Sequence, residues 1–287
     1  MQRPAVTIVE VGPRDGLQNE KKIIPTADKL RLISLLSDCG FGRIEATAFV
    51  SPRWVPQMAD SDEVMRNAVR RDGLVLSALV PNERGALAAV AAGAQELAIF
   101  AAASETFSRK NTNCTIEEAL RRFAPIMPIA AAHGLPVRGY VSCAVDCPYE
   151  GPIGPDAVVR VAARLRELGC TEIAVADTIG KAPPDRLGRM VEAVSAAVEP
   201  SRLAGHFHNT GGFALENVDV AYALGIRVFD AAVGGLGGCP YAPGAAGNLA
   251  TGLLVDHLEA RGIGTGIDRK ALAQAEAAVA AMVRSSE

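Results

Sequence analysis

Short runs of apolar and β-branched residues alternate with longer amphipathic, alanine-rich stretches along the whole chain of 287 residues. Each short run has the length of a buried strand, whereas each longer stretch has the spacing of a helix with one apolar face. This alternation is typical of a parallel sheet whose strands are connected by covering helices. The predicted strands are residues 7–11, 43–48, 75–80, 96–101, 137–141, 172–177, 203–208 and 228–233.

Eight strand–helix units in a chain of this length predict a (β/α)8 barrel, the TIM-barrel fold, as one domain over residues 1–287. An open doubly wound sheet would place a glycine-rich dinucleotide loop after the first strand, but residues 12–20 have the wrong glycine spacing. The predicted helices include residues 27–37, 116–132, 155–168 and 184–198, with an additional C-terminal helix at 271–283.

The composition is that of an ordinary globular protein, with 49% hydrophobic residues and a formal net charge of −3. This balance, without a basic stripe, argues against a nucleic-acid partner and favours a small-molecule substrate. A cytoplasmic location is expected because neither a membrane-spanning segment nor a signal pattern is recognised. The six cysteines are spread singly, which fits free thiols in a reducing compartment.

Polar residues gather at the carboxyl ends of the predicted strands, where the active site of a (β/α)8 barrel lies. They are far apart in sequence and converge only if the barrel closes. The set comprises Arg14, Asp15, Glu45, Asp177, His206, His208, Cys239 and Asn248.

His206 and His208 have the i, i+2 spacing that points two side chains to the same face of a strand. With the carboxylate of Asp15 and the amide oxygen of Asn248 they would form a mixed nitrogen and oxygen shell, suited to a divalent cation. The alternative is an ordinary pair of core or surface histidines at a strand end.

Arg14 is expected to hold a substrate oxygen and stabilise charge that develops on it, unless it forms only a surface salt bridge. Glu45 lies in an apolar strand and is expected to pair with Arg14 and fix its direction. Asp177 is either a general base or a group that orients its neighbours, and its spacing does not separate these roles.

Cys239 follows four glycines in five residues and precedes a proline. Glycines allow close backbone approaches, so a thiol on this loop can meet a substrate and act as acid, base or nucleophile. The alternative is a flexible surface turn.

On these residues the chain resembles the 3-hydroxy-3-methylglutaryl-CoA (HMG-CoA) lyase family, metal-dependent barrel enzymes related to isopropylmalate and homocitrate synthases. The resemblance runs almost end to end, and its first and last motifs together are its most specific part. The motifs are VEVGPRDGLQNE at 9–20, FVSPRWVPQM at 49–58, RGYVSC at 138–143, CPYEG at 147–151, DTIG at 177–180 and GLGGCPY at 235–241.

The resemblance implies a retro-Claisen cleavage of HMG-CoA to acetyl-CoA and acetoacetate by a homodimer. It implies that Arg14 polarises a substrate carbonyl, that Cys239 supplies a proton, and that Asp177 or His206 removes one. The implied ligands of Mg²⁺ or Mn²⁺ are Asp15, His206, His208 and Asn248; the implied substrate contacts are Arg14, Gln18, Asn111 and Thr178.

Four positions depart from the pattern of the family: Ala48 and Ala174 stand where serines are usual, Asn209 replaces an aspartate, and Gly252 replaces an acidic residue. A less polar pocket would favour a related 3-hydroxyacyl-CoA with another substituent at the third carbon. A non-catalytic CoA-ester-binding paralogue is a further alternative. An iron-dependent oxygenase could use two histidines and a carboxylate, but it would leave Cys239 without a role.

Overall fold

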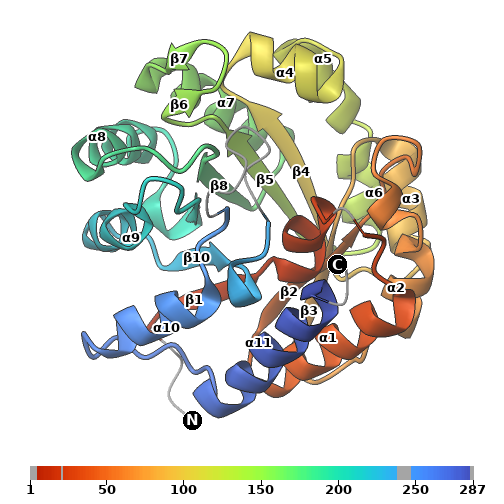
Figure 1. Cartoon of the computed structure of the whole chain (residues 1–287). Helices are drawn as coiled ribbons and strands as arrows, with labels where there is room; N and C mark the ends of the chain where they lie inside the picture. Colours follow the sequence, from red (N-terminus) through yellow and green to blue (C-terminus); the bar gives the residue numbers. More distant parts are fainter. Residues whose placement is uncertain (1–4, 21, 238–246, 285–287) are drawn as a thin grey trace.

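Eight parallel strands form a closed barrel in the order β1-β10-β9-β8-β5-β4-β3-β2 (Figure 1). The computed structural model describes residues 5–20, 22–237 and 247–284. The predicted TIM-barrel fold is therefore confirmed. The barrel strands are β1 (Thr7–Glu10), β2 (Arg43–Ala48), β3 (Val75–Leu79), β4 (Glu96–Ala102), β5 (Val137–Ser142), β8 (Glu172–Asp177), β9 (Leu203–Phe207) and β10 (Val228–Ala231).

Helices surround this barrel, and a small hairpin of β6 (Asp146–Cys147) and β7 (Gly151–Pro152) follows β5 (Figure 1). The helices are α1 (Thr26–Asp38), α2 (Ser61–Asn67), α3 (Glu83–Ala91), α4 (Glu105–Thr112), α5 (Ile116–Phe123), α6 (Ile126–Ala132), α7 (Pro155–Leu168), α8 (Pro184–Ser195), α9 (Ala214–Ala223), α10 (Thr251–Glu259) and α11 (Arg269–Arg284). Short helical turns are η1 (Gly12–Gly16), η2 (Pro56–Met58), η3 (Pro200–Arg202) and η4 (Val233–Gly235).

The prediction of one continuous helix at 116–132 is wrong, because the segment forms the two helices α5 and α6. Pro125 lies at the break, and a proline has no backbone N–H with which to continue a helix. The predicted helix at 155–168 is confirmed. The expected C-terminal helix is also present as α11, which packs against α1 and η4 (Figure 1).

Alternation along the strands separates the interior of the barrel from the face that the helices cover. Ala176, His206 and Asp230 are aligned on β8, β9 and β10 and face the interior, where His206 and Asp230 are hydrogen bonded. Residues one position away, such as Phe207 and Phe229, face the helices and belong to the hydrophobic core. Because side chains alternate between the interior and the helices, a polar residue reaches a site inside the barrel only if it occupies an interior-facing position of its strand.

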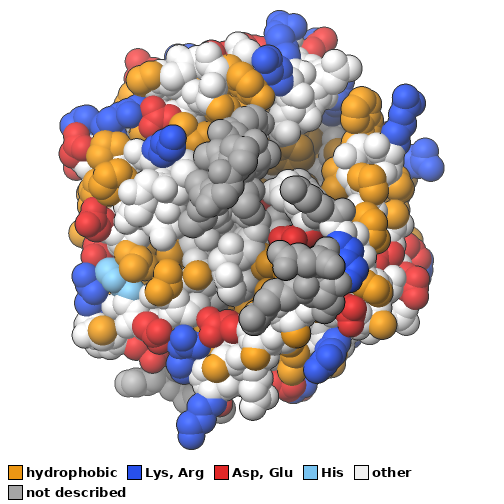
Figure 2. Space-filling view, viewed as in Figure 1, with side chains coloured by type: hydrophobic (Ala, Val, Ile, Leu, Met, Phe, Trp, Pro, Cys, Tyr) orange, Lys and Arg blue, Asp and Glu red, His pale blue; other side chains and the backbone are white. Residues whose placement is uncertain are grey.

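Acidic and basic side chains are interspersed over the face of the molecule drawn in Figure 2. Among the described residues, no helix is both long enough and apolar enough to cross a membrane.

Candidate active site at the barrel mouth

The turn η1 carries Arg14 and Asp15 directly after β1. The carbonyl of Val11 accepts hydrogen bonds from the backbone N–H groups of Arg14, Asp15 and Gly16 at 2.8–3.2 Å. This tight turn brings Arg14 and Asp15 back over the carboxyl end of the barrel, and Arg14 is 6% exposed.

Asp15, His206 and His208 form the candidate metal centre. Their ligand atoms all lie within 4.8 Å of one another. The Nε2 atoms of the two imidazoles are 3.3 Å apart, and His206 Nε2 is 3.9 Å from Asp15 Oδ2. The expected same-face placement of the two histidines is confirmed, and nitrogen and oxygen donors at these separations fit a divalent cation.

The charge states of two of these side chains suit a metal ligand. Burial lowers the pKa of His208 to about 4, so its ring is neutral at physiological pH. Burial by itself would raise the pKa of Asp15, but Arg14 and the two histidines outweigh it and hold the pKa of this carboxyl below its usual range. Metals bind neutral imidazoles and ionised carboxylates.

Asp230 and Arg138 orient His206, and the sequence did not suggest either role. The Nδ1 atom of His206 is 3.0 Å from Asp230 Oδ2, and Arg138 Nη2 donates to Asp230 Oδ1 at 2.7 Å. Although burial opposes ionisation, Arg138 and His206 lower the pKa of Asp230 to about 2. A hydrogen bond at Nδ1 leaves Nε2 for a ligand. The available signal was an aspartate within the apolar run at 228–233.

Arg14 pairs with Glu45 through Nε, which confirms the expected pairing, and with Asp15 through Nη1. Tyr140 fixes the other side of Glu45, because its hydroxyl donates to Glu45 Oε2 at 2.7 Å. Burial alone would lower the pKa of Arg14, but the two carboxylates raise it above its ordinary value. The guanidinium is therefore a permanent positive charge held in one direction beside Asp15.

Asp177 lies on the opposite face of the barrel wall from His206. It is aligned with Phe207, and its carboxylate accepts the backbone N–H groups of Gly180 at 3.1 Å and Ala182 at 3.0 Å. A Cβ on Gly180 would lie 2.7 Å from backbone and side-chain atoms of His208, so this loop packs directly against the histidine. Burial raises the pKa of Asp177 to about 6. These contacts favour the orienting role over that of a general base.

Asn248 joins the metal centre from the segment that precedes α10. Its Nδ2 donates to Asp15 Oδ2 at 2.8 Å and to the Leu236 carbonyl at 3.2 Å. Gly237 has a φ of 98° and approaches this amide closely. Cys239 lies outside the described residues, so its predicted role remains a prediction.

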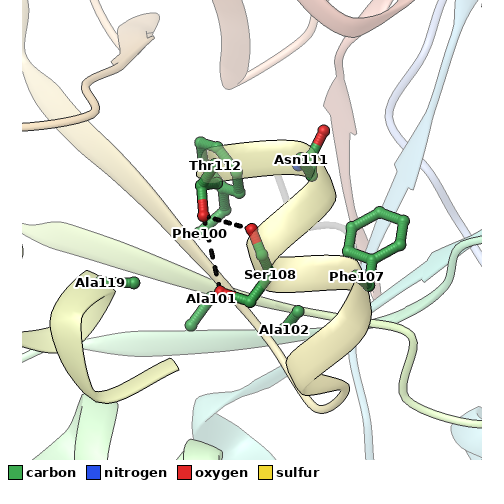
Figure 3. A pocket seen from close by; sticks show the side chains of 8 residues that line it. All are labelled: Phe100, Ala101, Ala102, Phe107, Ser108, Asn111, Thr112 and Ala119. Atoms are coloured by element: carbon green, nitrogen blue, oxygen red, sulfur yellow. Dashed lines mark hydrogen bonds between the residues drawn. The ribbon is translucent and has the colours of Figure 1, made fainter. Parts of the chain in front are cut away.

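The three other expected substrate contacts have different surroundings. Gln18 is half-buried just after η1, and the hydroxyl of Thr178 accepts the backbone N–H of Cys143 at 2.7 Å. Asn111 is exposed on α4, beside a small cavity between α4, α5 and β4 (Figure 3). Their contact with substrate remains a prediction.

Two of the departures from the family pattern involve positions near this mouth. Asn209 Oδ1 accepts the backbone N–H of Ala214, so its side chain holds the start of α9. Ala174 is fully buried and aligned with Tyr140, on the interior face of the barrel. The methyl group of Ala174 makes that part of the wall apolar.

The fold and the site together define a (β/α)8-barrel protein with a candidate metal centre at the carboxyl end of its strands. The family model described as HMGL-like matches residues 5–279, and the chain belongs to this family. The resemblance inferred from the motifs is therefore confirmed.

Individual relatives agree with this assignment. The chain is 51% identical to the hydroxymethylglutaryl-CoA lyase of Pseudomonas mevalonii, over 97% of this chain and 93% of the relative. The HMG-CoA lyase structure from Brucella melitensis has a TM-score of 0.96 and 53% identity, covering 98% of this chain and 100% of that one. An HMG-CoA lyase from Acinetobacter baumannii, solved with coenzyme A and 3-methylmalate, has a TM-score of 0.93 and 40% identity, covering 99% and 93%. The expected enzyme class, a carbon–carbon lyase of the HMG-CoA lyase type, is confirmed.

Proposed function

We propose that this chain is a divalent-metal-dependent lyase that cleaves HMG-CoA into acetyl-CoA and acetoacetate. The observation that carries the proposal is the convergence of Asp15, His206 and His208 beside Arg14. The 51% identity to a hydroxymethylglutaryl-CoA lyase supports the same reaction. The relative that binds coenzyme A supports a CoA ester as the substrate.

Asp15, His206, His208 and the amide oxygen of Asn248 would hold Mg²⁺ or Mn²⁺. When bound, such a cation polarises substrate oxygens and lowers the cost of removing the hydroxyl proton. The donor set fits either cation, because Asp15, His206 and His208 bring a carboxylate and two imidazoles within 4.8 Å of one another. Asn248 lies beside Asp15 with its Nδ2 toward the carboxylate, so its amide would turn to offer the oxygen to a cation.

The reaction requires one proton to leave the tertiary hydroxyl and another to reach the departing carbon. When the hydroxyl loses its proton, its oxygen forms the ketone of acetoacetate and the carbon–carbon bond breaks. The electron pair moves to the enolate of acetyl-CoA, where the charge of Arg14 stabilises it. A proton from the thiol of Cys239 then completes acetyl-CoA.

His206 is the better placed of the two candidates for the base. It faces the interior, and Asp230 at Nδ1 would stabilise the imidazolium that forms when Nε2 accepts a proton. The base would replace the metal-ligand role proposed for His206, because one Nε2 atom cannot bind a cation and accept a proton together. A His206→Asn variant that loses Mn²⁺ affinity would identify a metal ligand, whereas one that keeps Mn²⁺ affinity and loses turnover would identify the base.

A related 3-hydroxyacyl-CoA is the second candidate substrate. Alanines at positions 48 and 174, where serines are usual in the family, favour it because they remove two hydroxyl groups from the barrel. We also propose a cytoplasmic homodimer, as expected from the sequence and the family resemblance.

Acetyl-CoA release by the metal-stripped protein, with Mg²⁺ or Mn²⁺ added back, tests the function. We expect cleavage of HMG-CoA only after metal addition, and faster cleavage than of homologues that differ at the third carbon. Preference for a homologue would change the substrate and keep the chemistry. Tight binding of metal and CoA ester without cleavage would instead identify a non-catalytic paralogue.

Replacing the thiol tests the proposed proton donor. Cys239→Ala should lower turnover by at least about 100-fold, because general acid catalysis typically contributes 10²–10⁴-fold. Mn²⁺ affinity should remain unchanged, since the thiol is not among the proposed ligands. Near wild-type turnover of Cys239→Ala would show that the thiol is not the proton donor.

A further inference from the structure

Glu10, at the end of β1, is a buried acid that the proposed chemistry does not use. Its neighbour Val9 is aligned with Asp230 on the interior face, so Glu10 faces the surrounding helices. The side chain is 0% exposed. Removing a carboxylate from water is costly unless hydrogen bonds compensate it.

Three segments supply those hydrogen bonds. Glu10 Oε1 accepts the backbone N–H of Gly12 at 2.7 Å and that of Val233 at 2.9 Å. Glu10 Oε2 accepts the hydroxyl of Thr251 at 2.7 Å. One carboxyl group therefore joins η1, η4 and α10, which are far apart in the sequence.

Each of these segments leads into the candidate active site. Gly12 begins the turn that carries Arg14 and Asp15. Val233 begins η4, whose chain continues toward Gly237 at the metal centre. Thr251 begins α10, three residues after Asn248. The Glu10 carboxyl group therefore contacts the backbone segments that carry the candidate ligands Asp15 and Asn248.

Two glycines leave space for buried acids in this region: Gly12 beside Glu10, and Gly252 beside Glu276. A Cβ on Gly12 would lie only 2.6 Å from Glu10 Oε1. A Cβ on Gly252 would overlap Oε1 of Glu276, a residue of α11 that pairs with Arg269 at 3.0 Å. Glu276 therefore occupies space beside α10 that is open because residue 252 is a glycine.

We propose that Glu10 is a positioning residue for the metal centre: its carboxyl group fixes η1, η4 and the start of α10 relative to one another. It thereby keeps Asp15 and Asn248 within reach of His206 and His208. This inference rests on the proposed function, because it assigns Glu10 to the metal site of that reaction.

Two variants of Glu10 test the proposal through Mn²⁺ affinity, measured by titration with the metal alone. Glu10→Ala removes all three hydrogen bonds and should weaken Mn²⁺ binding roughly 10–100-fold, the usual effect of losing a group that orients metal ligands. Glu10→Gln keeps the acceptor for both backbone N–H groups and can donate to Thr251. It should therefore bind Mn²⁺ within about threefold of the wild type.

Thr251→Val removes one of the three hydrogen bonds and should weaken Mn²⁺ binding about fivefold. Leu165→Ala is the matched control, because Leu165 is a fully buried residue of α7, away from these segments. It should lower stability without changing the Mn²⁺ affinity of the folded protein.

Wild-type Mn²⁺ affinity in Glu10→Ala, or in Thr251→Val if Glu10→Ala does not fold, would overturn the proposal. Metal titration does not require turnover, so its result is independent of which CoA ester is cleaved. Failure of the wild type to release acetyl-CoA would contradict the proposed function alone.

Discussion

The carboxylate of Asp230 lies 3.0 Å from Nδ1 of His206 and thereby directs Nε2 of that ring toward Asp15 and His208. The two residues are aligned on neighbouring strands, β9 and β10, so the contact follows from the register of the barrel. Arg138 holds the second oxygen of Asp230 from β5. The candidate metal centre is therefore supported from inside the barrel as well as by the loops at its mouth.

Asp230→Asn should weaken Mn²⁺ binding roughly 10–100-fold, because the neutral amide orients His206 less firmly and removes one of the carboxylates that pair with Arg138. Metal titration of the purified variant measures this loss, and thermal unfolding shows whether the barrel remains folded. Unchanged affinity in a folded Asp230→Asn protein would mean that Asp230 does not orient a metal ligand.

Asp177→Asn distinguishes a base from a loop-holding residue. The N–H groups of Gly180 and Ala182 are bound by different oxygens of the carboxylate, and an amide keeps only one of these oxygens. We therefore expect a loss of about 1–2 kcal/mol of stability and a less than tenfold decrease in turnover. Urea unfolding and steady-state kinetics measure the two effects. Asp185→Asn, at an exposed position on α8, is the control for the change of charge. If turnover instead decreased by about 100-fold or more while stability stayed unchanged, the base would be Asp177.

Gly237→Ala should weaken Mn²⁺ binding by about tenfold, because the added Cβ would lie 2.6 Å from Nδ2 of Asn248. The same change at Gly73 is the matched control. Gly73 also has a positive φ, 81°, but no atom lies within 4 Å of its added Cβ. Both variants should lose stability through backbone strain, about 1–3 kcal/mol. Equal Mn²⁺ affinity in the two variants would show that Gly237 provides a turn but no close approach to the metal centre.

Much of the barrel could be predicted from the sequence because strands and helices have different hydrophobic periods. The eight strands were found within one or two residues at each end, whereas Pro125 divided a helix that the apolar pattern had joined. The convergence of Asp15, His206 and His208 followed from the rule that barrel strands end at one mouth.

The residues that support the site were harder to predict, because their partners come from other strands and loops. Asp230 orients His206 through strand register, and Glu10 contacts segments more than 200 positions along the chain. Asp177 is at a strand end, as predicted. Only the alternation within β8 shows that its side chain faces away from His206.

Glu10 should also make stability depend on pH, since burial raises its pKa from the usual 4.5 to about 7 despite the hydrogen bond from Thr251. Glu276 on α11 contributes to this rise, while Gly12 and Val233 oppose it. The folded state binds the proton more tightly than the unfolded state, so this group stabilises the fold below pH 4.5. That stability is lost as the pH rises to about 7.

The Glu10→Gln variant tests this pH dependence, because an amide at residue 10 cannot titrate. The wild type should therefore lose roughly 3 kcal/mol relative to Glu10→Gln between pH 4.5 and 7, as measured by urea unfolding across that range. Glu117→Gln, at an exposed position on α5, should follow the wild type. Parallel pH profiles of the wild type and Glu10→Gln would show that residue 10 does not change its proton affinity on folding.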